Sequence, residues 1–108
     1  MSISPSLAEI DTTVQKLRLE QHHRAFTHTL GHIVTAIGEL PDSPPQGFTT
    51  ESMVRLRELA DEAVDAVERR IDSGGDGVAD QQQLAGTIYE IRRRMEIVEL
   101  WFRRPESA

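Results

Sequence analysis

The sequence LAGTIYEIRRRMEIVELWF, residues 84–102, decides the fold class of this 108-residue chain. Its large apolar residues recur at steps of four and three along the whole stretch: Leu84, Ile88, Ile91, Met95, Val98 and Phe102. Because an α-helix turns once every 3.6 residues, this spacing places them all on one face of a long helix. A helix with one continuous apolar face is stable only when another element covers that face.

We call such a row of apolar residues along one helix face a seam. A second seam lies just upstream and consists of Met53, Leu56, Ala60, Ala63, Val67 and Ile71. The two seams predict helices over about 50–72 and 81–103, joined by a glycine-containing loop over 73–80. Thr49 is expected to cap the first of these helices, with Phe48 packing against Met53, and Asp80 is expected to cap the second. The sequence therefore predicts a C-terminal helical hairpin.

The segment 6–40 predicts one more helix, which ends at the prolines of a loop over 41–49. Its apolar residues form two stripes, Leu7, Ile10, Val14 and Leu17, and then Phe26, Leu30, Ile33, Ile37 and Leu40. At 100° per residue the second stripe is rotated by about 130° from the first, so one straight helix cannot aim both at the same partner.

Two structures would bury both stripes. In the first, the helix is continuous and its first half packs on a second protomer. In the second, the helix breaks near residues 21–24. No glycine or proline lies between Ser6 and Thr29, and a sharp break normally needs such a residue. We therefore expect the continuous helix.

The expected fold is a single all-α domain over residues 1–108, a three-helix bundle with a long first helix and coiled-coil-like seams. The alternative is a four-helix bundle. Apolar residues off the seam near the C-terminus would meet the first stripe of a neighbouring chain, which predicts a homodimer. The predicted interface residues are Leu7, Ile10, Val14, Leu17, Ile97, Leu100 and Trp101.

The amino-acid composition excludes some classes of function for this chain. The chain has no cysteine, 38% hydrophobic residues, 28% charged residues and a formal net charge of −6. This excludes thiolate chemistry, and the acidic balance argues against a nucleic-acid partner, whose phosphates attract basic proteins. No segment predicts a membrane span or a signal peptide, so we expect a cytoplasmic protein.

Four histidines, His22, His23, His28 and His32, fall within one short stretch. His28 and His32 are four residues apart and share a helix face, so they are the candidate metal ligands. Glu39 lies on that face about 10 Å further along the axis, too far to complete the set. We expect no metal and no other cofactor.

The stretch from His28 to Gly38 resembles the motif of histidine phosphotransfer domains, which are helical bundles. His28 matches the phospho-accepting histidine, Leu30 the leucine at plus two, and Gly38 the glycine at plus ten. Gly31 stands where that family has lysine. The resemblance implies that His28 accepts and donates a phosphoryl group.

The helix over 50–72 carries acidic residues opposite its seam, and the last helix carries arginines at 92–94, which predicts solvated ion pairs. No set of nucleophile, base and orienting residue is evident. We therefore expect a non-catalytic regulatory or adaptor protein that acts through an unidentified protein partner. The alternatives are phosphotransfer through His28 and a metal-binding bundle.

Overall fold

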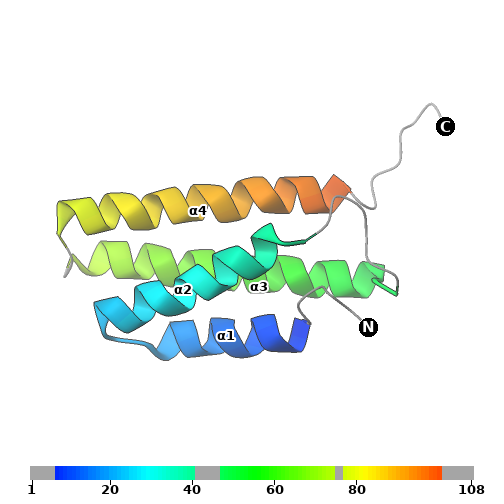
Figure 1. Ribbon diagram of the computed structural model, residues 1–108, viewed down its shortest axis with the longest axis horizontal. Helices are drawn as coiled ribbons and strands as arrows, with labels where there is room; N and C mark the ends of the chain where they lie inside the picture. The colour runs from blue at the N-terminus through cyan, green and yellow to red at the C-terminus, as the bar shows by residue number, and fades with distance from the viewer. Residues whose placement is uncertain (1–6, 41–46, 75–76, 101–108) are drawn as a thin grey trace.

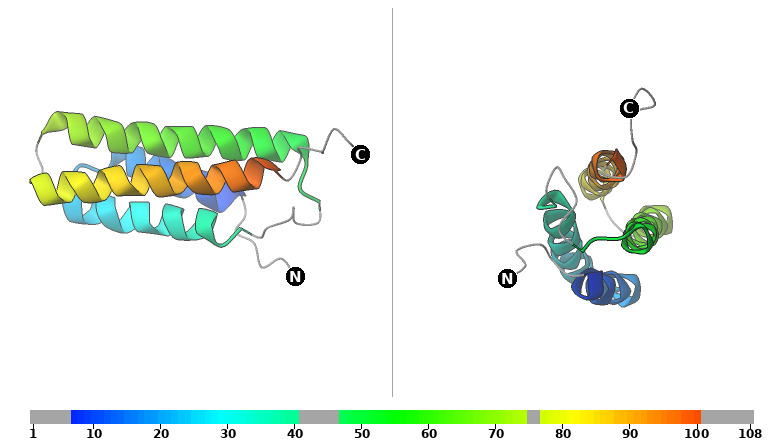
Figure 2. Two further views of the ribbon diagram at one scale, coloured as in Figure 1. Left: turned by 90° about the horizontal axis from the view of Figure 1, so that it is seen from above. Right: turned by 90° about the vertical axis from the view of Figure 1, so that its right-hand side faces the viewer.

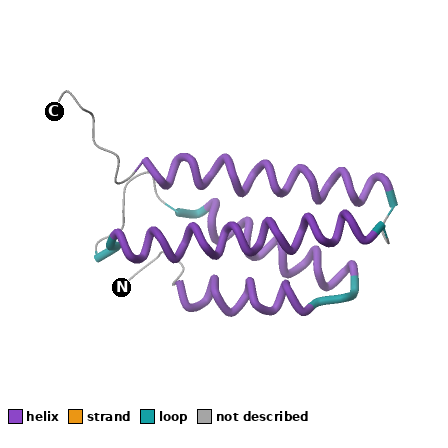
Figure 3. Tube along the Cα trace, turned by 180° about the vertical axis from the view of Figure 1, so that it is seen from behind, coloured by secondary structure: helices purple, strands orange, loops and turns teal. Residues whose placement is uncertain are grey.

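The computed structural model describes residues 7–40, 47–74 and 77–100. These residues form helices and no strand (Figure 1). The helices are α1 (Leu7–Leu19), α2 (His23–Gly38), α3 (Thr50–Ser73) and α4 (Val78–Glu99). Successive helices run in opposite directions, and the α1–α2 and α3–α4 connections lie at the same end of the bundle (Figures 1 and 3). The all-α class expected from the sequence is confirmed.

The helices form a square when the bundle is viewed end-on (Figure 2). Both α1 and α4 pack against α2 and α3, which places α1 diagonally opposite α4 and α2 diagonally opposite α3. Chain direction makes α1 and α3 parallel neighbours, and likewise α2 and α4. Each helix thus has two neighbours and needs an apolar stripe wide enough for both.

The predicted seams form much of the core. On α4, Leu84, Ile91, Met95 and Val98 are buried, Ile88 is half-buried, and Phe102 lies outside the described residues. On α3, the buried seam residues are Met53, Leu56, Ala60, Ala63 and Val67. Three further buried residues of α3, Leu59, Val64 and Ala66, lie beside the predicted seam. They widen its stripe because α3 packs against α1 as well as α4.

The ends of α3 follow the predicted capping. The Thr49 hydroxyl accepts a hydrogen bond from the Ser52 amide at 3.1 Å, and Phe48 packs against the core. Gly74 ends the helix with φ of 70°, a left-handed conformation that favours glycine. The predicted cap of α4 is wrong: Gly77 is the N-cap, so α4 begins at Val78 and Asp80 lies within its first turn.

The continuous first helix is also a wrong prediction. The chain leaves α1 at Leu19 and starts α2 at His23, close to the break in the alternative prediction. Between Leu17 and Phe26 no large apolar side chain is buried, and Leu19 is 81% exposed. A break in this segment therefore exposes no apolar side chain that a continuous helix would bury. Folding the chain back on itself turns both apolar stripes toward one core. Burying each large apolar side chain stabilises the fold by roughly 1.5–3 kcal/mol.

This reversal removes the first stripe from the predicted interface. Ile10, Val14 and Leu17 are 0–3% exposed within one chain, and Leu7 packs at the edge of the core. Ile10, Val14 and Leu17 therefore cover the molecule's own core and are not available to a second copy. The first stripe therefore gives no support to a homodimer.

Candidate functional site

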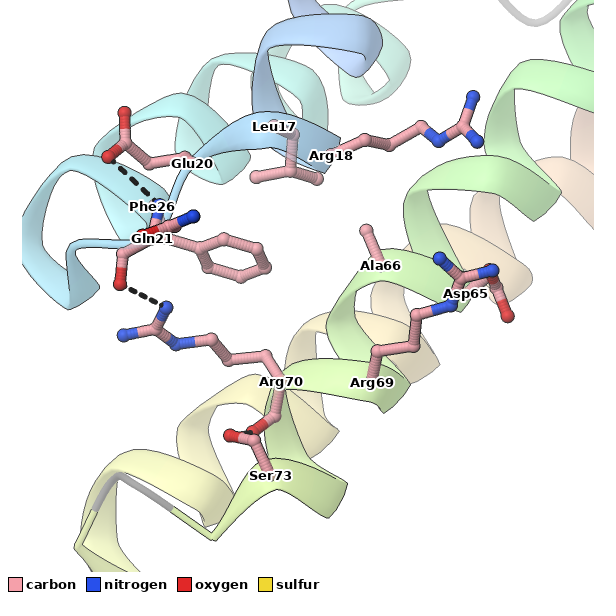
Figure 4. A pocket seen from close by; sticks show the side chains of 10 residues that line it. All are labelled: Leu17, Arg18, Glu20, Gln21, Phe26, Asp65, Ala66, Arg69, Arg70 and Ser73. Atoms are coloured by element: carbon pink, nitrogen blue, oxygen red, sulfur yellow. Dashed lines mark hydrogen bonds and ion pairs between the residues drawn. The ribbon is translucent and has the colours of Figure 1, made fainter.

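The α1–α2 corner, residues 20–22, is held by side chains in place of a glycine or proline. The Glu20 carboxylate accepts hydrogen bonds from the backbone amides of Gln21 and His22, both at 3.2 Å. From α3, the Arg70 guanidinium donates to the Gln21 carbonyl at 2.7 Å (Figure 4). These bonds satisfy backbone groups that the interrupted helix would otherwise leave unpaired.

A pocket lies beside this corner, and Figure 4 shows Phe26 pointing into it. The Arg70 guanidinium lies 5.2 Å from the centre of the Phe26 ring, within the range of a cation–π contact. The other two arginines of the pocket face carboxylates: Arg69 pairs with Asp65 at 2.8 Å, and Arg18 pairs with Glu62 at 3.4 Å. Carboxylates of α3 thus balance the charges of these two arginines.

His28 and His32, here called the histidine pair, lie on the outward face of α2. Their Nε2 atoms are 3.2 Å apart, and the rings meet edge to face with centroids 4.7 Å apart. The two imidazoles that the sequence placed on one face are thus in direct contact. Both side chains are exposed, so the pair is accessible to a ligand.

The residues that line the hollow beside the histidine pair include no lysine or arginine. The hollow is lined by Thr27, Gly31, Thr35, Ala36 and Glu39 together with the pair itself. At the position where the resemblance to phosphotransfer domains leads one to expect a lysine, the chain has Gly31, which offers no cation to a phosphoryl group on His28. In the part of the chain that the structure describes, no three metal-ligating side chains gather into a metal site.

The other two histidines have different surroundings. His22 is the N-cap of α2, although its side chain makes no capping hydrogen bond. The Nε2 atom of His23 lies 3.6 Å from the Asp80 carboxylate, which links the first turns of α2 and α4. Neither histidine belongs to the pair, so the four clustered histidines form no single site.

A groove runs between α2 and α4. One part is lined by Thr27, Leu30, Gly31, Val34, Thr35, Gln83, Leu84, Gly86, Thr87 and Glu90. The adjoining part is lined by Val34, Ile37, Gly38, Glu90, Ile91, Arg93, Arg94 and Ile97. Val34 and Glu90 line both parts, which makes the groove continuous along the two helices. No spacing or motif in the sequence predicted this groove.

Helical glycines line the α2–α4 groove. A Cβ atom added at Gly31, Gly38 or Gly86 would meet nothing within 4 Å. Packing within the chain therefore does not require glycine there, although glycine inside a helix costs about 0.5–1 kcal/mol relative to alanine. The unexplained glycines in the sequence were the signal for this surface.

Of the predicted interface residues, Ile97 and Leu100 keep exposed surface, and so does Leu7 at the edge of the core. Ile97 is half-buried in the groove and Leu100 is 55% exposed, while Trp101 lies outside the described residues. Arg94, on the same side of α4, donates to the carbonyls of Ile37 and Leu40. It thereby satisfies the C-terminal end of α2, where a cation is favourable.

Ion pairs hold the acidic face of α3. Glu58 pairs with Arg55 at 3.3 Å, and Glu68 pairs with Arg92 of α4 at 3.8 Å. Across the α1–α3 contact, Arg55 donates to the Asp11 carboxylate at 2.9 Å. This hydrogen bond, helped by one from Gln15, lowers the pKa of Asp11, and it also raises the pKa of Arg55. The acidic face thus joins helices instead of gathering into a cation site.

Comparison with models of known protein families, with curated proteins and with solved structures gave no match to this chain. None of the helices in the described ranges is both long enough and apolar enough to cross a membrane.

Proposed function

We propose that this protein is a non-catalytic regulatory or adaptor protein that binds an amphipathic helix of another protein in the α2–α4 groove. The observation that carries the proposal is the open backbone at Gly31 and Gly86, on opposite sides of the groove. Glycine without an internal packing role allows the backbone of a second molecule to approach closely. Helix-in-groove binding is a common mode of recognition between proteins.

The lining of the groove suits such a helix. Val34, Ile37 and Ile97 supply an apolar floor at one end, and Glu90 and Arg93 supply charges at its rim. An apolar centre with a polar rim is typical of protein interfaces. A bound helix would place apolar residues over the floor and charged residues at the rim.

The test compares the wild-type chain with a variant whose groove is filled. In cross-linking and affinity capture from the native cell, wild type should retain a defined partner that Gly31→Leu with Gly86→Leu loses. Asp61→Leu is the matched control, because it adds a leucine to the exposed face of α3 and should retain the partner. Capture of the same partner by the filled-groove variant, with its helical circular dichroism unchanged, would refute the proposal.

Self-association through the same surface is a narrower prediction. Among the described residues predicted for the interface, Ile97 and Leu100 offer the apolar surface that a second copy would cover. Light scattering should then give twice the mass of one chain. If the protein is a monomer at high concentration, self-association is refuted and the partner is a different protein.

Phosphotransfer through His28 is the second candidate. The exposed imidazole on the outward face of a four-helix bundle favours it, together with open space at Gly31. Gly31 in place of that family's lysine weighs against it, because a phosphoryl group adds a charge of about −2. We expect a phosphodonor not to label the protein, and stoichiometric acid-labile labelling lost in His28→Gln would reverse the ranking.

A further inference from the structure

The two Nε2 atoms of the histidine pair are separated by a distance that one metal ion can bridge. A divalent ion placed about 2.05 Å from both Nε2 atoms, the usual zinc–imidazole distance, would see them at an angle of about 100° for the observed 3.2 Å separation. That angle is close to the tetrahedral value that zinc prefers. The separation of the two nitrogens therefore already suits a single shared ion.

The helix beneath the pair fixes this spacing. His28 and His32 stand one turn apart in the interior of α2, whose opposite face carries Leu30 and Ile33 at 3% and 1% exposure. A buried face resists rotation or fraying of the helix. The pair can therefore bind an ion with little further loss of backbone conformational entropy. That loss is the main free-energy cost of assembling a metal site.

We propose that His28 and His32 bind one divalent transition-metal ion, of the Zn²⁺, Ni²⁺ or Cu²⁺ class, through their Nε2 atoms. Imidazole nitrogen favours these ions, whereas Mg²⁺ and Ca²⁺ favour oxygen ligands. On binding, the hydrogen bond between the rings is replaced by two nitrogen–metal bonds. The proton that it held moves to Nδ1 of the same ring, so both imidazoles coordinate in the neutral form.

The site is open on its outer side. Glu39 lies two turns away, and no third ligand from the described residues joins the pair. Water occupies the remaining coordination positions, as in metal sites that exchange an outside ligand. This inference concerns the outward face of α2 and does not depend on a partner in the α2–α4 groove.

The test uses the full chain without an affinity tag and Zn²⁺ alone as the probe, followed by titration calorimetry. One ion should bind per chain, and His28→Gln or His32→Gln should each weaken binding by at least about tenfold. His22→Gln and His23→Gln are the matched controls and should leave the affinity unchanged. All four side chains are exposed or half-buried, and circular dichroism verifies that each variant is folded.

A second readout is the thermal midpoint. Zn²⁺ should raise the midpoint of wild type and of the two controls, because an ion that binds only the folded state stabilises it. It should leave the His32→Gln midpoint unchanged, and Mg²⁺ should shift none of them. The proposal is overturned if wild type binds no Zn²⁺, if His28→Gln binds as tightly as wild type, or if His23→Gln is the variant that loses the ion.

Discussion

The two helical hairpins of this bundle differ in what fixes their turns. The α3–α4 hairpin turns beyond Gly74, whose positive φ ends α3, and a side-chain cap at Thr49 starts α3. The α1–α2 hairpin turns at Glu20–His22 with no glycine, no proline and no residue at positive φ. Its turn is held by the Glu20 carboxylate and by Arg70, which comes from another helix.

This difference shows that a sharp reversal does not need a helix-breaking residue. A polar stretch between two apolar stripes is sufficient when a third helix supplies the missing hydrogen-bond partner. Local capping in one hairpin and a tertiary contact in the other then give two antiparallel hairpins that turn at the same end of the bundle (Figure 1). Substitutions in the two hairpins should distinguish stabilisation by local capping from stabilisation by tertiary contacts.

The largest effect is expected where both hairpins enter the core. Leu17 of α1 and Ile91 of α4 are 0% and 1% exposed. Leu17→Ala and Ile91→Ala should each lower the free energy of unfolding by about 2–5 kcal/mol in urea melts, because each leaves a cavity. Leu19→Ala is the control and should change stability by less than about 0.5 kcal/mol. A cost below about 1 kcal/mol for Leu17→Ala would mean that α1 lies outside the core.

The next effect tests the tertiary contact at the α1–α2 corner. Arg70→Ala should cost about 1.5–3 kcal/mol, since it removes a charged hydrogen bond to Gln21 and uncovers Phe26. Arg69→Ala is the matched control, because its exposed pair with Asp65 is worth only about 0.3–0.5 kcal/mol. Urea melts give the cost, and amide hydrogen exchange should locate the opening at residues 20–26. Equal costs for the two arginines would remove Arg70 from its role in the turn.

A smaller effect compares the turns themselves. Gly74→Ala should cost about 1–2 kcal/mol in urea melts, because alanine is strained at a φ of 70°. Gln21→Ala should be neutral within about 0.5 kcal/mol, since the backbone of the α1–α2 corner suits any residue and the Gln21 contacts are made by its backbone. If Gln21→Ala costs as much as Gly74→Ala, the two turns do not differ in the way described.

The smallest effect is a pH dependence that ties the two hairpins together. The hydrogen bond from Arg55 of α3 lowers the pKa of Asp11 of α1, so the pair stabilises the folded state when Asp11 is ionised. That contribution is complete above the ordinary aspartate pKa of about 3.9 and is lost as the pH falls through the lower folded value. Wild type should therefore lose more stability than Asp11→Asn between neutral pH and acid.

Urea melts at the two pH values measure this difference, and added salt should reduce it because both side chains are solvated. Asp61→Asn, on the exposed face of α3, should follow the wild-type acid dependence. An Asp11→Asn variant that loses as much stability in acid as wild type would contradict the contribution of this pair.

The candidate surfaces were only partly readable from the sequence. The histidine pair was predicted from its four-residue spacing, because that spacing fixes neighbours on any helix. The α2–α4 groove was missed, since helices from the two halves of the chain form it and no local pattern says which helices become neighbours. Gly31 and Gly86 were visible as costly residues, but their open space appears only when α2 and α4 lie side by side.

The sequence by itself determined the all-α class, the limits of α3, the α3–α4 hairpin and most of the buried residues. Each of these depends on periodicity or capping within a few turns of helix, where residue spacing sets geometry directly. Only the tertiary structure decided the reversal at Glu20–His22 and the burial of Ile10, Val14 and Leu17 in the chain's own core. Out-of-phase stripes allow either a second chain or a fold-back, and the decision rests on contacts such as Arg70 to Gln21, which are 49 residues apart in sequence.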